Sequence, residues 1–472
     1  MAKKAPRGLW GILMVLGPSL VWCGEYIGSG EVIIATRTGA ALGTLVLWAV
    51  VIGIFLKYWI GLCGARYTVA TGEGMIDCFA RAPAGRYWLV PIVFIGQVFA
   101  GITSIGALAV AAATFLGELI DLGPHSTLIW GTVVTVFACI VVGSGRFSLL
   151  KTIMGLLVLV IVVGVLYVAL HTLPTVRDLV VGAFGFQVPD VPDWVRAADP
   201  SVKSVWSEVL PLLGWAAGGF ASQVWYTYWV MGAGYGMAAD RKWGMPADEA
   251  RLASLSAKDA EQVRPWLRVV ATDATVALVI GVVVTGAFLV AGAGILRPAE
   301  SLPKGPEVAF ELSRLFSERW AETGALLFIL AGTAAMISTQ LGQLAGWPRL
   351  LADCFRLLCR PFGRWKPRRQ FLLFLALFLV TNLTISALFG KSPVTLVKLG
   401  AIFDGLLLVP LQALAVGWAL FVAQKRLLSP EAHAILHPRW YHAAGLLVAF
   451  GVFAYFCIFQ VPQVVAEMLS AG

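Results

Sequence analysis

Long apolar runs recur along the whole chain and leave few alternatives for its fold. Eleven segments are apolar enough to cross a hydrocarbon layer of about 30 Å, which takes roughly 20 residues of helix. They span about 9–41, 42–65, 88–116, 127–144, 148–171, 207–230, 268–295, 322–346, 370–390, 395–422 and 440–468. Only 13% of the residues are charged, whereas soluble domains carry about 25%. The sequence therefore predicts an all-α polytopic membrane protein.

The basic residues follow the topology of these segments. With the N-terminus inside, 24 of the 35 Lys and Arg residues fall on the inner side of the membrane, and Lys57 lies within the second segment. This asymmetry follows the positive-inside rule, so the net charge of +9 gives no reason to expect a nucleic-acid partner. We expect a multi-pass protein of the cell (inner) membrane with a cytoplasmic N-terminus and an extracytoplasmic C-terminus.

Two of the predicted spans contain glycine-rich interruptions. The first carries GEYIGSGEVI at residues 24–33, where two carboxylates flank Gly28-Ser29-Gly30, although an ionisable group in hydrocarbon costs about 2.5–3.5 kcal/mol. The sixth reads GWAAGGFASQVWYT at residues 214–227. Paired interruptions in corresponding positions of two halves indicate a transporter site near the midplane. We predict that both helices unwind, near 28–30 and 219–223, and that their freed carbonyls line a cavity.

The positions of the two interruptions also predict the domain organisation. We expect a single transmembrane transporter domain made of a first repeat at about 9–171, a second at about 207–422 and an extra helix at about 440–468.

Several motifs resemble the Nramp family of metal transporters. Residues 17–31 are similar to that family's first span, which runs from Gly-Pro-Gly to Tyr-Ile-Asp-Pro-Gly-Asn. Residues 65–72 (ARYTVATG) are similar to its Ala-Arg-Leu-Gly-Val-Val-Thr-Gly, and residues 221–226 stand where it has Met-Pro-His-Asn-Leu-Tyr. The Val409-Pro410 pair resembles its Leu-Pro. The resemblance implies a LeuT-type inverted-repeat fold with about eleven helices, of which helices 1 and 6 are broken.

The chain departs from the family at the positions that bind metal. The family's Asp, Asn and Met ligands correspond to Gly28, Glu31 and Ala221 here, and its span-six histidine corresponds to Tyr228. The acids of its third span correspond to the sequence TSIGA at residues 103–107. We therefore expect a divergent branch that lacks the usual metal-binding motifs and is not tightly coupled to protons.

The polar residues at the interruptions are the candidate site. A metal is expected at Glu31, Gln223 and the Gly28 carbonyl, and the alternative role of Glu31, capping the half-helix that follows the break, is compatible with metal binding. Gly28 and Ala221, being small, are expected to widen the site. Glu25 is a second ligand, a proton acceptor, or the partner of Arg37 or Lys57. The full set of candidate substrate-binding residues is Glu31, Gly28, Ser29, Gln223, Ala221, Thr227, Glu25 and Asp404. We expect Gln97, Gln340 and Gln343 to join helices instead.

These residues offer oxygen ligands, which suit a hard ion such as Mg²⁺ or Mn²⁺. The predicted function is Nramp-like transport of a divalent cation by a monomer in the lipid bilayer. The alternative is a small organic solute or anion, held beside aromatic residues such as Trp22, Trp225 and Tyr226. Neither HExxH nor GxSxG occurs, so we do not expect an enzyme, and no resident cofactor is expected.

Overall fold

The computed structural model describes residues 5, 6, 8, 11, 16–28, 30–241, 243–303, 308–388, 398 and 400–469, without the side chains of 168, 308–325, 468 and 469. This part of the chain is almost entirely helical. The first half contains α2 (Pro18–Tyr26), η1 (Gly30–Ala35), α3 (Thr36–Leu42), η2 (Gly43–Val46), α4 (Leu47–Thr71), α5 (Met75–Ala80), α6 (Leu89–Leu119), α7 (Ser126–Gly143), α8 (Phe147–Leu170), α9 (Val176–Phe184) and α10 (Asp193–Ala198).

The second half combines long helices with several that are broken or contain π-helical segments. It contains α11 (Trp206–Trp215), α12 (Phe220–Ala233), η3 (Gly236–Ala238), α13 (Glu249–Ala253), α14 (Ala257–Ala291), η4 (Gly292–Leu296), α15 (Val308–Leu358), α16 (Arg360–Gly363), α17 (Pro367–Leu388), η5 (Phe403–Leu407), α19 (Val409–Trp418), η6 (Ala419–Ala423), α20 (Gln424–Leu427), α21 (Pro430–Leu436), α22 (Trp440–Tyr455), η7 (Phe456–Gln460) and α23 (Val461–Leu469).

Nine helical stretches in the described residues are long and apolar enough to cross a membrane. One of the nine, Gly30–Thr71, contains both the second half of the first predicted span (η1 and α3) and the whole second span (α4), and α2 completes the first span. The α11–α12 pair, interrupted in its middle, supplies the sixth span. The all-α, polytopic fold with about eleven spans and broken helices 1 and 6 is thereby confirmed. The N-terminus-inside orientation and the division into two repeats stay predictions.

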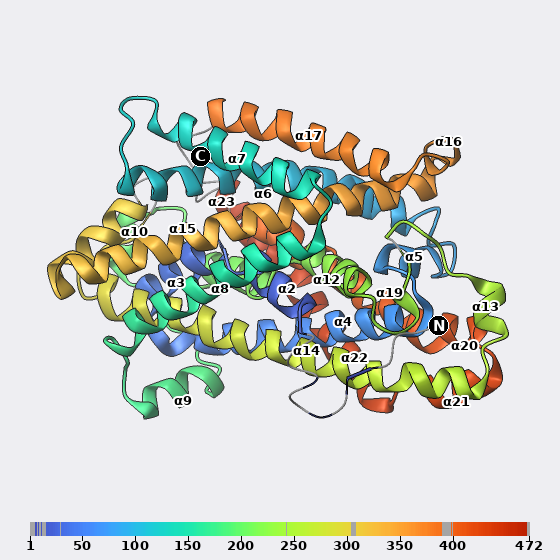
Figure 1. The fold of residues 1–472 in the computed structure, drawn as a ribbon. Helices are drawn as coiled ribbons and strands as arrows, with labels where there is room; N and C mark the ends of the chain where they lie inside the picture. Colours follow the sequence, from blue (N-terminus) through green and yellow to red (C-terminus); the bar gives the residue numbers. More distant parts are fainter. Residues whose placement is uncertain are drawn as a thin grey trace.

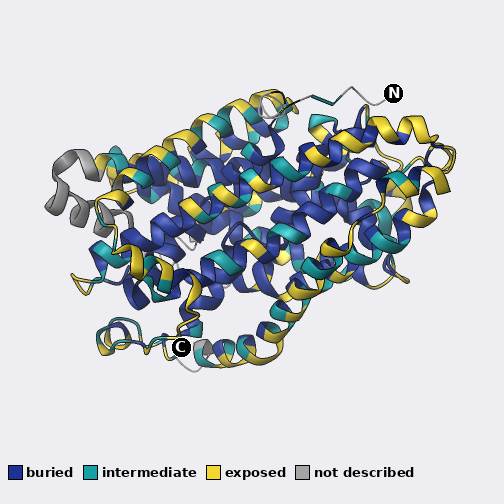
Figure 2. Cartoon of the chain, turned by 90° about the horizontal axis from the view of Figure 1, so that it is seen from below, coloured by how far each residue is buried: buried dark blue, intermediate teal, exposed yellow. Residues whose placement is uncertain are grey.

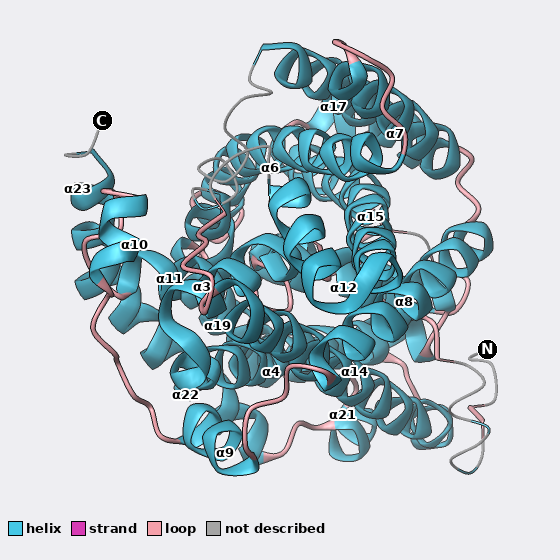
Figure 3. Cartoon of the chain, turned by 90° about the vertical axis from the view of Figure 1, so that its left-hand side faces the viewer, coloured by secondary structure: helices cyan, strands magenta, loops and turns pink. Residues whose placement is uncertain are grey.

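The broken helices lie in the interior of the bundle. In the view along the bundle, α12 is surrounded by longer helices, with α4 and α14 on one side and α6 and α15 on another (Figure 3). Buried residues fill this centre, and exposed residues lie along the outer helices (Figure 2). Short helices occupy the two ends: α3, α9 and α10 lie at the left of Figure 1, and α5, α13, α16 and α20 at the right. The broken segments are therefore shielded from lipid by intact helices.

Each break has a local cause in the sequence. Helix α2 ends at Tyr26 because Ile27 is extended (φ −75°, ψ 90°) and Gly28 follows it. Helix α11 ends at Trp215, after which Ala217 (φ 58°) and Gly218 (φ 73°) adopt left-handed backbone that glycine tolerates best. The second break thus covers residues 216–219. Our expectation that it extends to Gln223 is wrong, since α12 begins at Phe220 and Gln223 is helical.

Candidate functional site

A small cavity lies where the two breaks meet. Its volume is about 20 Å³, which is enough for one water molecule or one ion. Helix α2, the α11–α12 break, α15 and η5 contribute its walls. The lining residues are Glu25, Tyr26, Gly30, Trp215, Gly218, Gly219, Trp225, Thr339, Gln343, Trp347 and Asp404. Glu25 and Asp404, predicted as site residues, are thus brought together, although they are 379 positions apart in the sequence.

Glu25 enters the cavity from the last turn of α2, and 3% of its surface is exposed. The Ser222 hydroxyl donates to Glu25 Oε2 at 2.6 Å, and the Trp22 indole in turn donates to Ser222 Oγ at 2.9 Å. This chain of donors fixes the position of the carboxylate and joins the two broken helices. Arg37 and Lys57 bond other groups, so the expected role of Glu25 as the partner of one of them is wrong.

Asp404 faces the same cavity from the opposite helix. Its Oδ1 accepts hydrogen bonds from Gln97 Nε2 at 3.0 Å and from the Ala221 amide at 3.1 Å. The Ala221 amide belongs to the first turn of α12, whose dipole favours a negative charge. Gly219 allows this approach, because a Cβ there would overlap Asp404 Oδ2. Ala221 therefore serves the site through its backbone rather than by widening it.

Two polar residues of α15 complete the wall and were missed by the sequence reasoning. Thr339 Oγ1 donates to the Ile27 carbonyl at 3.1 Å, and Gln343 Oε1 accepts from Ser104 at 3.3 Å. Gln97, beside the cavity, accepts from the Trp347 indole at 2.8 Å while donating to Asp404. Isolated polar residues in an apolar helix were the available signal, but their spacing alone did not show which face they occupy.

Lys57 places a positive charge at the break in helix 6. Its fully buried ammonium donates to the carbonyls of Gly214, Ala216 and Gly218 at 2.6, 2.8 and 2.8 Å. These carbonyls lie at the carboxyl end of α11, where the helix dipole also favours a cation. The Ala217 carbonyl accepts from Gln223 Nε2 at 3.3 Å. Gly218 and Gly219 do line the cavity, but the carbonyls of residues 214, 216, 217 and 218 already accept hydrogen bonds from Lys57 and Gln223.

Glu31 is buried in the turn that follows the first break. The Gly28 amide donates to Glu31 Oε2 at 2.9 Å, and Thr285 Oγ1 lies 3.5 Å from Oε1. This is the capping arrangement that the sequence analysis set beside metal binding. Glu31 is absent from the described residues that line the cavity. Its role as a metal ligand stays a prediction.

The other candidates lie close to the cavity but outside its wall. Gly28 packs against Thr339, whose hydroxyl would overlap a Cβ at residue 28, so the glycine does not widen the site as expected. Thr227 joins helices, donating to the Val224 carbonyl at 2.6 Å and accepting from the Met75 amide at 3.2 Å. Ser29 lies outside the described residues. Within the described residues, no three His, Cys, Asp or Glu side chains form a metal-binding group.

A buried charge network closes one end of the bundle. Glu208 of α11 bonds Arg37 Nε of α3 at 3.0 Å and Lys398 Nζ at 2.7 Å, and Arg37 also bonds Asp199 at 2.6 Å. Arg37 and Glu208 are fully buried. One carboxylate thus ties together both broken spans and the tenth span.

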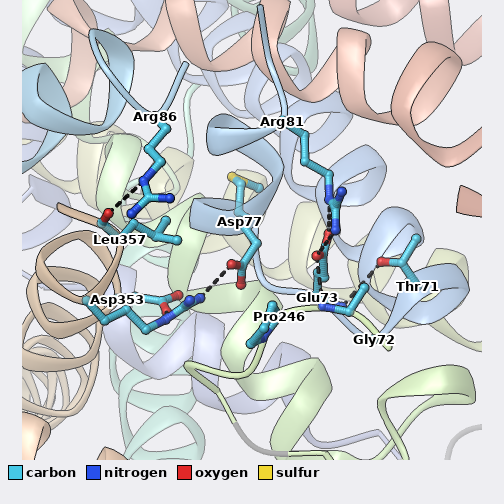
Figure 4. Close-up of polar contacts among 12 residues, drawn as sticks. Thr71, Gly72, Glu73, Asp77, Arg81, Arg86, Pro246, Asp353 and Leu357 are labelled. Atoms are coloured by element: carbon cyan, nitrogen blue, oxygen red, sulfur yellow. Dashed lines mark hydrogen bonds and ion pairs between the residues drawn. The ribbon is translucent and has the colours of Figure 1, made fainter. Parts of the chain in front are cut away.

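A second network lies at the other end (Figure 4). Arg356 bonds Asp77 at 2.6 Å and Asp353 at 2.5 Å, and Tyr228 donates to Asp353 at 2.9 Å. Tyr228 is therefore part of this network. Burial raises the pKa of Asp77 to about 7, with Arg356 opposing the shift and Asp353 adding to it.

Beside this network, Arg81 forms ion pairs near the start of α5. It bonds Glu73 at 2.6 Å and Glu249 at 2.9 Å. Burial would raise the pKa of Glu73, but hydrogen bonds and charge from Arg81 hold it below its usual value. The central cavity thus lies between two charge networks, one at each end of the bundle.

Comparisons with known proteins agree with this geometry. Residues 20–198 match the model of the family described as "Natural resistance-associated macrophage protein-like". The fold is similar to that of the Eremococcus coleocola manganese transporter (TM-score 0.65, 15% identity, 99% of this chain and 95% of that chain). It is also similar to MhsT in complex with L-phenylalanine (TM-score 0.57, 13% identity, 99% and 100%). An uncharacterized protein of Pasteurella multocida is 27% identical over 104 residues, 21% of this chain and 23% of the relative.

Proposed function

We propose that the chain is a member of the Natural resistance-associated macrophage protein-like family, whose model matches residues 20–198, and that it is a secondary transporter that moves a divalent metal cation across the membrane. The observation that carries the proposal is the pair of carboxylates, Glu25 and Asp404, that reach one 20 Å³ cavity beside two broken helices. Carboxylates in the membrane are costly, and a bound cation would offset their charge. The manganese transporter with the same fold supports this substrate class.

The ligand chemistry favours a hard cation such as Mg²⁺ or Mn²⁺. The described residues around the cavity offer carboxylate oxygens, the Thr339 hydroxyl and the Gln343 amide, and include neither Met nor His. Oxygen ligands of this kind suit Mg²⁺ and Mn²⁺ better than softer metals. Glu31 would join them in a conformation in which its carboxylate leaves the Gly28 amide.

The transport is proposed to run without tight coupling to protons. The lining residues carry no imidazole, and Tyr228 stands at the position of the family's histidine. Lys57 Nζ already donates hydrogen bonds to three carbonyls of helix 6. Because these carbonyls already have a donor from the protein, no co-transported ion is needed to stabilise the break.

The test is binding followed by uptake. Purified protein should be stabilised against thermal unfolding by Mg²⁺ or Mn²⁺ at concentrations above their Kd, because a ligand of the folded state raises its stability. Proteoliposomes with an internal pH dye should take up the ion without matching acidification. Stabilisation by none of the divalent ions in the panel would refute the proposal, and one proton entering per ion would refute its uncoupled form.

A small organic solute is the second candidate, and the aromatic wall of the cavity is the observation that favours it. Trp215, Trp225, Trp347 and Tyr26 all line the site. Organic ligands occupy pockets of about 300–1,000 Å³, so this site would have to open considerably to hold one. Amino acids in the same thermal panel test this alternative, since stabilisation by them and not by divalent ions would favour it.

A further inference from the structure

A second, larger hollow lies between helices far from the central cavity. It has a volume of about 480 Å³ and lies between α4, the first part of α14, α21 and the start of α22. These elements meet at the right-hand end of the bundle (Figure 1). We call it the basic groove; its lining residues are Tyr58, Trp59, Leu62, Arg66, Arg264, Leu267, Arg268, Ala271, Ala434, Ile435, His437, Arg439, Tyr441 and His442.

The polar part of the basic groove is strongly cationic. Four arginines reach it from three elements, and no Asp or Glu is among its described lining residues. Arg264 pairs with Glu261 at 3.2 Å, but both side chains are about half exposed. Water screens such a pair, so Glu261 neutralises the charge of Arg264 only weakly. Within the described part of the chain, no ion pair neutralises Arg268 or Arg439. The groove therefore presents uncompensated positive charge.

Arg66 fixes the inner wall of the groove. Its guanidinium donates to the carbonyls of Leu436 and His437 at 3.3 and 3.0 Å, which holds the end of α21 against α4. Its buried Nε has no partner among the described residues. A buried N–H that lacks an acceptor is costly, so an acceptor supplied by a ligand would be favourable here.

The rest of the groove is apolar and lies along membrane-spanning helices. Trp59, Leu62, Leu267 and Ala271 form this wall, and Tyr58 and Tyr441 stand near the basic residues. Tyrosine and tryptophan favour the boundary between hydrocarbon and headgroups. A ligand that matches both parts carries a phosphate and an acyl chain, whereas free phosphate would leave the apolar wall unused.

We propose that the basic groove binds an anionic phospholipid, with the phosphate at Arg66, Arg268 and Arg439 and an acyl chain along Trp59 and Leu267. Basic pockets between transmembrane helices on the inner side of a membrane suit such headgroups. The groove lies at the end of the protein predicted to face the cytoplasm. A bound lipid would join α22, the last span, to α4 and α14.

Native mass spectrometry of the purified full-length chain tests this proposal. Protein reconstituted with equal phosphatidylglycerol and phosphatidylcholine should retain phosphatidylglycerol after detergent exchange. The double variant Arg268→Gln/Arg439→Gln should bind it about tenfold more weakly, because two phosphate contacts are lost. The control Arg368→Gln/Arg369→Gln removes two exposed arginines from α17, outside the groove, and should bind as the wild type does.

Three results would overturn the proposal. They are equal loss of phosphatidylglycerol in both double variants, equal retention of the two lipids by the wild type, and displacement of the lipid by inorganic phosphate at matched concentration. If Arg268→Gln/Arg439→Gln does not fold, the proposal is still tested on the wild type, by its retention of the two lipids and by competition with inorganic phosphate. Arg66 is left unchanged because it holds α21 in place.

Discussion

The ammonium nitrogen of Lys57 lies 2.8 Å from the carbonyl oxygen of Gly218, in the middle of the broken sixth span. The same nitrogen bonds the carbonyls of Gly214 and Ala216, so one side chain of α4 completes the end of α11. Backbone groups that leave a helix inside a membrane need partners from the protein or from water. Lys57 is such a partner.

Lys57→Met is therefore expected to destabilise the protein. It keeps most of the volume but leaves three buried carbonyls without a donor, at a cost on the order of 3 kcal/mol. Thermal unfolding in choline buffer measures the loss, and a small cation such as ammonium should restore part of it. The control Lys425→Met, at an exposed position of α20, should behave as the wild type does. Wild-type stability of Lys57→Met in choline buffer would contradict this role.

Gly219→Ala should impair the site without a change of charge. The new methyl group would overlap the Asp404 carboxylate and push it away from the Ala221 amide. We expect at least about tenfold weaker divalent binding, equivalent to ~1.4 kcal/mol. Calorimetry measures it, with Gly451→Ala as control, because a Cβ there meets no atom within 4 Å. Equal affinity in both variants would show that the Asp404 position does not matter.

Glu208→Gln should loosen the end of the bundle closed by α3 and α11. The change leaves Arg37 and Lys398 buried without their shared carboxylate, which costs roughly 3–5 kcal/mol in comparable buried pairs. Hydrogen exchange should become faster in both helices. Asp193→Asn, which removes an exposed ion pair, is the control and should leave exchange unchanged. Unaltered protection in Glu208→Gln would mean that apolar packing alone closes this end.

Asp77 should make stability depend on pH. Its pKa is about 7 in the folded protein against an ordinary value of 3.8, so the folded state keeps a proton that the unfolded state has lost between these values. The stabilisation is full below pH 3.8 and is lost as the pH rises through 7. Asp77→Asn should therefore flatten the melting temperature between pH 5 and 8, while the exposed control Asp190→Asn should not. An unchanged slope in Asp77→Asn would contradict this assignment.

The overall architecture was predictable because it depends on local sequence properties. Apolar length defines the spans, and the glycine clusters at 28–30 and 218–219 mark the interruptions. The positions of individual side chains depend instead on the packing of distant helices. Lys57 was considered as a partner of Glu25, but its partners are carbonyls more than 150 residues away. The cavity wall contributed by α15 was missed for the same reason.

Glu31 is the clearest example of a residue whose role could not be predicted from the sequence alone. Alignment with the family made it a metal ligand, whereas its hydrogen bond with the Gly28 amide is that of a helix cap. Glu31→Gln distinguishes the two roles. The metal-ligand prediction requires divalent binding to weaken by ~10-fold or more, about 1.4 kcal/mol. Unchanged affinity with a lower melting temperature would leave Glu31 as a cap alone.

The most direct test of the whole account is calorimetric titration of Mg²⁺ and Mn²⁺ into the purified wild type, Glu25→Gln and Asp404→Asn. Both variants keep the shape of the side chain and remove one charge from the cavity. The account predicts binding to the wild type and at least about tenfold weaker binding to each variant. Wild-type affinity in both variants would contradict the claim that these two carboxylates hold the transported cation.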